Sequence, residues 1–328
     1  MTGIGIIGAG HFGAVHARAI AQVEGLEIAA VCREDAEAVA AFATEHGGKP
    51  YVNWRDLLAD PTVEAVVIAT PHHLHRDIAI GAAEAGKHIL LEKPMAPSLA
   101  ECDDINAVVA KAGVHLMVGH VMHFALPCLK AKEIIASGAI GKPVIGSSVM
   151  IKFWMESNRR AWHLSKADGG GMLMTAGIHS LDRLMWLMGE DVVGVNALVG
   201  TFFHEQEADD TALIGLRFAG GGIGQVRSVG YRDGVFDYSM ELQCENGALR
   251  LDFDNGIALS KDGQWVPVPD STEPDWANRA VIREWQSLLA AIRGETPIPV
   301  DGRYARHVVS VIDAAYRASD ERREIQPQ

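Results

Sequence analysis

The sequence predicts an α/β protein of two domains: an N-terminal doubly wound parallel sheet, then an α+β domain on a mostly antiparallel sheet. Between Thr2 and Gly119, short apolar runs alternate with helical segments, which is typical of a parallel sheet. Later runs mostly alternate apolar and polar residues and are joined by turns such as Asn246-Gly247. A length of 328 residues is sufficient for two domains, and we expect them to span residues 1–121 and 122–328.

Composition excludes several classes of function. A formal net charge of −13 argues against binding to nucleic acid, because phosphates would be repelled. No apolar run approaches the roughly 20 residues of a membrane span, and the N-terminus enters a strand without a signal peptide. The four cysteines show no C-x-x-C spacing. We therefore expect a cytoplasmic protein with free, mostly buried thiols and no membrane partner.

A glycine motif at the N-terminus carries the first functional signal. The apolar run Thr2–Ile7 predicts a strand, Gly8-Ala9-Gly10-His11-Phe12-Gly13 a tight turn, and Ala14–Gln22 a helix. Gly8 permits the turn, Gly10 allows the backbone to approach a pyrophosphate, and Gly13 allows close packing of helix on strand. The N-terminus of the helix would favour the phosphate charge. The pattern predicts a dinucleotide site.

The end of the second predicted strand bears on the choice of dinucleotide. Leu26–Val31 leads into Cys32-Arg33-Glu34-Asp35, about 20 residues after the glycines. An acidic residue there binds the ribose hydroxyl of NAD, whereas arginine favours the 2′-phosphate of NADP. Arg33 therefore favours NADP over NAD. Glu34 or Asp35 could still bind the ribose, or all three could be solvated turn residues.

Three further apolar runs, Ala65–Ala69, His88–Leu91 and Leu116–Gly119, complete the predicted parallel sheet. Asn53 is expected to cap a short helix, and Ser98 with Glu101 forms a capping box that opens a helix to about Lys111. Ligands of such sheets bind beyond the carboxyl ends of the strands. That rule places five groups on one edge: Gly8–Gly13, Arg33, Thr70–His75, Glu92–Pro94 and Gly119–His123.

The second half is predicted from alternation and turns. We expect strands over about 144–153, 192–199, 211–218, 223–229, 238–244, 249–253 and 257–260. Helices are expected over about 126–137, 172–188, 279–293 and 302–319. Trp154 and Phe153 are expected in the core.

Several motifs distributed along the chain occur together: the glycine motif, Ala69-Thr70-Pro71…His75, Glu92-Lys93-Pro94, Gly138–Pro143, Gly169-Gly170-Gly171-x-Leu173…Gly177-x-His179…Asp182 and Ala314–Ser319. In this combination the chain resembles the Gfo/Idh/MocA family, named for glucose–fructose oxidoreductase and inositol dehydrogenase. The resemblance covers nearly the whole chain. It implies an N-terminal Rossmann domain, a C-terminal domain with an open antiparallel sheet, and a homodimer or homotetramer formed through that sheet.

The resemblance implies an NAD(P)-dependent oxidoreductase that transfers a hydride to or from a hydroxyl or carbonyl of a sugar, cyclic polyol or related compound. Lys93 corresponds to the cation that hydrogen-bonds the reacting oxygen, and His179 to the acid/base histidine. Expected cofactor contacts are Gly8, Gly10, His11, Phe12, Gly13, Cys32, Arg33, Thr70, Pro71, His72, His75, Glu92 and Lys93. Expected substrate contacts are Lys93, His120, Arg160, Trp162, His163, Thr175 and His179.

The chain departs from the family pattern at Thr175, where polyol dehydrogenases of the family carry an aspartate. Positions 175 and 179 are one helical turn apart, so an aspartate there could stabilise an imidazolium, which threonine cannot. Either His179 works with Lys93 alone, or another group takes the place of the missing carboxylate. Candidates are Asp182, Asp168, His123 and His163.

Two further motifs each suggest a binding site that another interpretation could replace. Arg160, Trp162 and His163 suit a sugar ring or a carboxylate, but could equally form a packed loop. His72-His73-x-His75 has no second set of ligands at metal spacing, so no metal is expected. Two other functions stay open: an NAD-dependent glycoside hydrolase of the same type, and a sensor that binds the dinucleotide without turnover.

Overall fold

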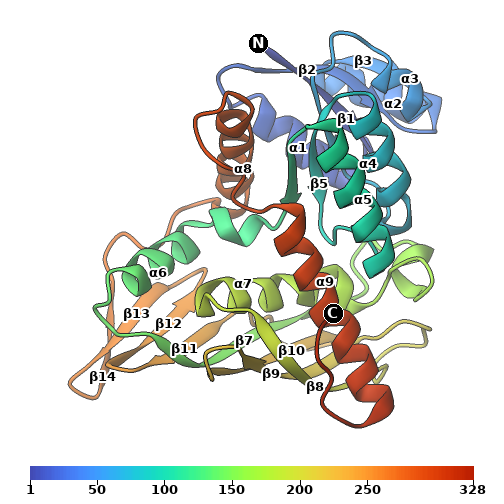
Figure 1. Cartoon of the computed structure of the whole chain (residues 1–328). Helices are drawn as coiled ribbons and strands as arrows, with labels where there is room; N and C mark the ends of the chain where they lie inside the picture. The colour runs from blue at the N-terminus through green and yellow to red at the C-terminus, as the bar shows by residue number, and fades with distance from the viewer. The chain divides into compact units, whose positions relative to one another are not determined.

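The computed structural model describes all 328 residues, which divide into two compact units (Figure 1). The first unit comprises Met1–His120 with Val281–Arg306, and the second comprises Val121–Ala280 with His307–Gln328. The boundaries expected from sequence placed every residue after 121 in the second domain. The segment 281–306 belongs to the first unit and is hydrogen-bonded to it, as when Asn106 Nδ2 donates to the carbonyl oxygen of Gly302 (3.1 Å).

The first unit is built on a six-stranded sheet in the order β3-β2-β1-β4-β5-β6, with every neighbouring pair parallel. This is the strand order of dinucleotide-binding doubly wound folds, and it confirms the predicted fold class. The apolar runs are buried on both faces, as parallel strands require. The strands are β1 (Thr2–Ile7), β2 (Leu26–Cys32), β3 (Lys49–Tyr51), β4 (Ala65–Ile68), β5 (His88–Glu92) and β6 (Leu116–Gly119).

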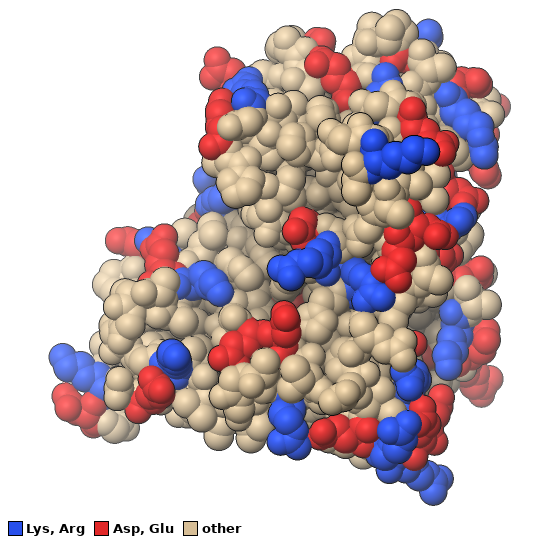
Figure 2. All heavy atoms as spheres, in the orientation of Figure 1, with Lys and Arg blue, Asp and Glu red and all other residues tan.

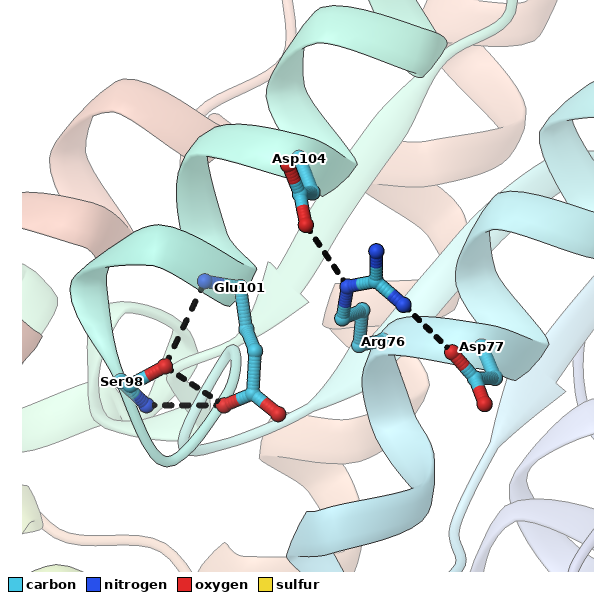
Figure 3. Close-up of polar contacts among 5 residues, drawn as sticks. All are labelled: Arg76, Asp77, Ser98, Glu101 and Asp104. Atoms are coloured by element: carbon cyan, nitrogen blue, oxygen red, sulfur yellow. Dashed lines mark hydrogen bonds and ion pairs between the residues drawn. The ribbon is translucent and has the colours of Figure 1, made fainter.

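Local capping sets several helix boundaries of this unit. Ser98 Oγ accepts from the backbone N–H of Glu101, whose carboxylate accepts from the N–H of Ser98, as the capping box predicts (Figure 3). Arg76 donates to Asp104 (2.7 Å) and so joins α4 to α5 (Figure 3). The helices are α1 (His11–Ile20), α2 (Ala36–His46), α3 (Trp54–Leu58), the 3₁₀ turn His72–Leu74, α4 (His75–Glu84), α5 (Leu99–Ala112) and most of α8 (Trp276–Ile292).

The second unit contains an eight-stranded sheet in the order β14-β13-β12-β11-β7-β10-β9-β8. Neighbours are antiparallel except β7 and β10, which confirms the mostly antiparallel prediction. The strands are β7 (Pro143–Phe153), β8 (Val192–Gly200), β9 (Thr211–Phe218), β10 (Ile223–Tyr231), β11 (Met240–Cys244), β12 (Gly247–Asp252), β13 (Gly256–Lys261) and β14 (Gln264–Pro267).

Helices cover one face of this sheet. Figure 1 shows α6 (Leu126–Ala136) and α7 (Ile178–Met188) along the same side, where α6 packs on β12 and β13 and α7 on β7 and β10. Most of α9 (Gly302–Glu321) also belongs to this unit. Strand residues of the opposite face remain exposed: Leu198 and Leu213 lie opposite each other, with 69% and 47% of their surface accessible.

Several predictions from sequence were wrong in detail. Helix α1 begins at His11, so Gly13 lies inside its first turn and does not precede it. Phe153, expected in the core, is exposed at the end of β7, whereas Trp154 is fully buried as predicted. Strands β3 and β14 were not predicted, because segments this short lack a clear alternation.

The surface and thiols agree with the compositional expectations. Lys and Arg side chains are interspersed with Asp and Glu over the face shown in Figure 2. All four cysteines are free, and Cys32, Cys102 and Cys128 are buried. None of the helices combines the length and apolar character that crossing a bilayer requires.

Candidate functional site

The three glycines of the glycine motif, in the loop between β1 and α1 and the first turn of α1, serve two different purposes: two allow close packing of the backbone, and one leaves open space. A Cβ at Gly8, where φ is +100°, would collide with the carbonyl of Ala69, and one at Gly13 would collide with the carbonyl of Gly8. A Cβ at Gly10 would meet no protein atom within 4 Å. Packing of the chain therefore requires Gly8 and Gly13 but not Gly10, whose open side leaves room for a ligand to approach the backbone.

Two further features fit a dinucleotide at this loop. Helix α1 starts directly after Gly10, with no side chain capping its first N–H groups, so these donors and the helix dipole face the loop. Thr70, at the carboxyl end of β4, has a buried hydroxyl without a hydrogen-bond partner in the protein. Donors and space at the strand ends are what the pyrophosphate and ribose of a dinucleotide would use.

The end of β2 lies beside the same loop. The guanidinium Nη1 of Arg33 donates to the carbonyl oxygen of Ala9 (3.4 Å). The carboxylate of Asp35 caps α2 by accepting from the N–H of Ala38 (3.0 Å). Burial, with the charges of nearby acidic residues, raises the pKa of Cys32 to about 11, so its thiol stays protonated. Asp35, one of the two acidic candidates for the ribose, is therefore engaged as a helix cap, whereas Glu34 is not part of this cap.

Lys93 follows β5 directly and is almost fully buried, with 7% of its surface accessible. Its Nζ lies 5.9 Å from the centroid of the Phe12 ring, which is part of the glycine motif and lies in the first turn of α1. The carboxylate of Glu92 accepts from the backbone N–H of Lys93 (3.3 Å). Burial acts to raise the pKa of Glu92, but the hydrogen bond from His16 and the charge of Lys93 outweigh it, so the pKa falls. The ionised Glu92 carboxylate therefore bonds to the backbone of Lys93 and interacts with its charge.

His75 connects two of the strand ends. Its fully buried ring has Nδ1 2.9 Å from the carbonyl oxygen of Pro94 and Nε2 3.0 Å from that of Thr70. Burial lowers its pKa, and a neutral imidazole has one N–H to donate, so it serves one of these carbonyls at a time. The ring is thus committed to the protein and would influence a cofactor through the loops it joins. The ring of the neighbouring His72 lies 5.7 Å from it.

The first unit also contains His120, expected to contact substrate. Its ring is fully buried and lies edge-to-face with Tyr304, at 6.0 Å between centroids. His, Cys, Asp and Glu side chains form no group of three or more that could hold a metal ion.

In the second unit, the helix predicted over 172–188 is divided. Leu173–Gly177 forms a π-helical turn, and α7 starts at Ile178, which puts Thr175 in the turn and His179 in the first turn of α7. Such π-turns occur frequently at functional sites. The sequence did not predict this turn, because the apolar pattern of a π-turn differs little from that of an α-helix over five residues.

A buried carboxylate holds the start of this helical segment. Asp209 accepts from the N–H of Leu173 (2.8 Å) and from the hydroxyl of Tyr316 (2.7 Å). Burial raises its pKa to about 6. Gly171 has φ of +102°, and a Cβ there would collide with the Asp209 carboxylate. Gly171, the last of the three glycines, is therefore needed for this close approach.

The loop that precedes the glycines is bonded to itself. Arg160 Nη1 donates to the carbonyl oxygens of Ser157 (3.1 Å) and Arg159 (2.9 Å). The Arg160 N–H donates to His163 Nδ1 (3.0 Å), and the Trp162 ring stacks on His163 at 3.7 Å between centroids. The loop is ordered by these contacts and presents the exposed Arg160 side chain from the same unit as Thr175 and His179.

Two candidates for the absent carboxylate, Asp182 and His123, are paired with each other. His123 Nε2 lies 2.9 Å from Asp182 Oδ1, both side chains are buried, and the imidazole stacks on Trp186 at 4.2 Å. Asp168 lies in the loop before the glycines, where its N–H contacts Ser165 Oγ (3.4 Å). The contacts of Asp182 bind α7 to the segment before α6.

Both halves of the chain match models of known protein families. A model described as an oxidoreductase family with an NAD-binding Rossmann fold matches residues 2–120, and the GFO/IDH/MocA C-terminal domain matches residues 128–250. The chain belongs to the Gfo/Idh/MocA family. These matches confirm the resemblance and show that the protein is an oxidoreductase with an NAD-binding Rossmann fold.

Similar proteins include several that act on carbohydrates. A 1,5-anhydro-D-fructose reductase of Ensifer adhaerens is 30% identical over 226 residues, which are 67% of each chain. A 2,7-anhydro-N-acetylneuraminate hydratase of Mediterraneibacter gnavus is 32% identical over 268 residues, 80% of this chain and 71% of the relative. The crystal structure of the WlbA dehydrogenase from Bordetella pertussis, in complex with NADH and UDP-GlcNAcA, superposes with a TM-score of 0.88 at 25% identity, covering 99% of this chain and 97% of that one.

Proposed function

We propose that this protein is an NAD(P)-dependent dehydrogenase or reductase that acts on a sugar, a cyclic polyol or a related ketone. One observation carries the proposal: a buried lysine, Lys93, stands at a strand end beside Phe12 of a glycine motif that fits a dinucleotide. The carbohydrate relatives support the class of substrate.

The roles of the side chains follow from what hydride transfer needs. A bound nicotinamide would donate or accept the hydride. Lys93 would donate a hydrogen bond to the substrate oxygen and stabilise its developing negative charge. His179 would take up the hydroxyl proton during oxidation and return it during reduction, because an imidazole titrates near neutral pH. Thr175 would bind a substrate hydroxyl.

Turnover of the two single variants tests these roles. Sugars, anhydrosugars and inositols are screened with NAD(H) and NADP(H) by absorbance at 340 nm. On the best substrate, Lys93→Ala and His179→Ala should each reduce kcat at least about a hundredfold, the low end for acid–base groups. The exposed Lys49 of the first unit gives a matched control, and Lys49→Ala should leave kcat unchanged. A near wild-type rate for either variant removes that residue from the mechanism.

A second candidate is a reaction without net oxidation, because one relative is named a hydratase. It would require the dinucleotide but leave the absorbance at 340 nm unchanged. Mass spectrometry of the screened sugars separates the two cases, since water added or lost changes the mass by 18 Da, roughly, without consumption of NAD(P)H.

For the cofactor we propose NADP. The guanidinium of Arg33 lies against the glycine loop, and Asp35 is used as a helix cap, so one acidic side chain fewer is available for a ribose hydroxyl. Arg33→Ala should raise the KM for NADPH about tenfold to a hundredfold, the loss of a charged hydrogen bond, and change the KM for NADH little. Arg55→Ala is the matched control, and a wild-type preference for NADH would contradict the proposal.

We further propose that a second copy of the chain covers the exposed face of the eight-stranded sheet. Leu198 opposite Leu213 and Ile223 opposite Ile145 present apolar surface there. Light scattering coupled to gel filtration tests this, because Leu198→Asp with Leu213→Asp should convert the oligomer to monomer. A monomeric wild-type chain would contradict it.

A further inference from the structure

Three polar side chains form a hydrogen-bonded chain that leads to Lys93 within the first unit; two are fully buried, and the third, Glu92, has 16% of its side-chain surface accessible. The indole Nε1–H of Trp285, on α8, donates to His16 Nδ1 (3.1 Å). His16, on the inner side of α1, bonds through Nε2 to Glu92 Oε1 (2.9 Å). His16 is fully buried and Trp285 is 1% exposed, so water does not compete for the bond between them. The sequence alone predicted no function for His16 or Trp285.

The donor and acceptor chemistry fixes the state of the chain. An indole N–H can only donate, so His16 Nδ1 accepts and carries no proton. The proton of the neutral imidazole is therefore on Nε2, which donates to the carboxylate of Glu92. The other carboxylate oxygen accepts from the backbone N–H of Lys93 (3.3 Å). Each link thus determines the direction of the next.

The groups around Glu92 keep its carboxylate ionised. Besides His16 and Lys93, the titratable groups that act on it are His75 and Glu284. Glu284 adjoins Trp285 on α8, is 1% exposed and has one carboxyl oxygen without a partner. Burial, and then the charge of Glu92, raise the pKa of Glu284 well above its usual range, so it is neutral. Of these two carboxyls, the one next to Lys93 carries the charge.

We propose that Trp285, His16 and Glu92 form a chain of positioning residues that keeps Lys93 protonated and directed toward the glycine loop. The proposal rests on the function proposed for Lys93. A purely structural role, in which the chain only docks α8 on α1, would affect stability but not the state of the ammonium. The two roles therefore differ in what they predict for Lys93 itself.

The first measurement is the reactivity of Lys93 without any substrate. Trace labelling with acetic anhydride at pH 8, followed by peptide mass spectrometry, compares Lys93 with the exposed Lys111 in each variant. Trp285→Phe keeps the ring but removes the donor, and His16→Leu removes the whole link. Labelling of Lys93 should rise about fivefold in Trp285→Phe and further in His16→Leu. A Glu92 carboxylate that loses its hydrogen-bond donor takes up a proton more readily, and an ammonium near a neutral carboxyl releases its own proton more easily.

A conservative variant separates hydrogen bonding from packing. The amide of His16→Gln can accept from the indole and donate to the carboxylate, so labelling should return to within about twofold of wild type. Trp54→Phe, on α3 of the same unit, is the control for loss of an indole and should not change labelling. Thermal unfolding is recorded for all variants, so that a poorly folded His16→Leu leaves Trp285→Phe and His16→Gln to decide.

Kinetics distinguish failure of this proposal from failure of the proposed function. We expect kcat to fall in the same order as labelling rises, by about tenfold in Trp285→Phe, with KM for the dinucleotide within about twofold. If Trp285→Phe and His16→Leu show the same labelling and kcat as Trp54→Phe, the positioning role of Trp285, His16 and Glu92 is wrong, even if Lys93→Ala is inactive. Unchanged turnover in Lys93→Ala would instead overturn the proposed function, while labelling would still report on the chain.

Discussion

The two units bury polar side chains to different effect. In the first unit, the chain through His16 and Glu92 ends at the backbone of Lys93, on the edge of the sheet where the glycine loop lies. The chain starts at the fully buried Trp285 and His16 and ends, through the partly buried Glu92, at a residue of the candidate site. Hydrogen bonds in this unit run from the interior toward the place where chemistry would occur.

The second unit directs its buried charge into the framework. Arg183 on α7 is fully buried, and its guanidinium donates to Ser148 Oγ (2.9 Å) and to the carbonyl oxygens of Tyr238 (3.2 Å) and Ser239 (2.7 Å). These bonds fasten the helix to the sheet and go no further. Burial of a charged group therefore does not identify a reacting one; the destination of its hydrogen bonds does.

The largest expected effect tests the framework role of Arg183. Arg183→Met leaves a hydroxyl and two carbonyls without their donor, which should cost about 3 to 5 kcal/mol of unfolding free energy. Denaturant titration measures it, with the exposed Arg250→Met as a control expected to change stability by less than about 1 kcal/mol. A small loss for Arg183→Met together with a large loss of kcat would reverse the comparison between the units.

A second prediction concerns the carboxylate that holds the π-helical turn. The pKa of Asp209 is about 6, above its unfolded value near 3.8, so the folded state binds a proton more tightly. This contribution is fully present below about pH 4 and is lost as pH rises through about 6, a change of about 3 kcal/mol. Between pH 4.5 and 7.5 the wild type should lose about 2 kcal/mol of unfolding free energy relative to Asp209→Asn, because part of the contribution is already lost at pH 4.5.

The exposed Asp254 supplies the control for this pH effect, since Asp254→Asn should follow the wild type. An equal pH dependence for wild type and Asp209→Asn would mean that Asp209 ionises normally in the folded state. The second unit would then contain no titrating group at the start of the segment that carries Thr175 and His179.

The smallest predicted effect sharpens the reading of the glycine loop. Gly10→Ala adds a methyl group that no protein atom opposes, so unfolding free energy should change by less than about 0.5 kcal/mol. Dinucleotide binding should weaken about tenfold, because the methyl group occupies the side from which the pyrophosphate approaches. Fluorescence titration with NADH and NADPH measures this. Gly13→Ala is the contrasting variant, since its methyl group meets the backbone and should destabilise the unit.

Much of the first unit could be predicted from the sequence, because its signals are local. The glycine motif, the Ser98 capping box and the apolar runs each depend on residues close together in the chain, and the carboxyl ends of parallel strands then share an edge. The position of Lys93 on that edge follows from these rules. The dinucleotide-binding fold could therefore be predicted from the sequence.

What escaped prediction depends on distant partners. His16 is ordinary in sequence, and its role arises from Glu92 and from Trp285, which lie 76 and 269 residues away. Asp209 reaches Tyr316 over a separation of 107 residues. One usable signal was present: His16 lies one helical turn after Gly13, so its side chain turns toward the strand ends. No periodicity indicates which later helix supplies the indole.

The return of residues 281–306 to the first unit has a practical consequence for recombining relatives. A fragment cut at His120 would lack the indole for His16, the guanidinium of Arg306 for Asp103 and the carbonyl of Gly302 for Asn106. A graft intended to transfer cofactor preference must therefore carry two separate stretches of polypeptide. Shuffling experiments that move the first stretch alone should produce hybrids with an unsatisfied interior.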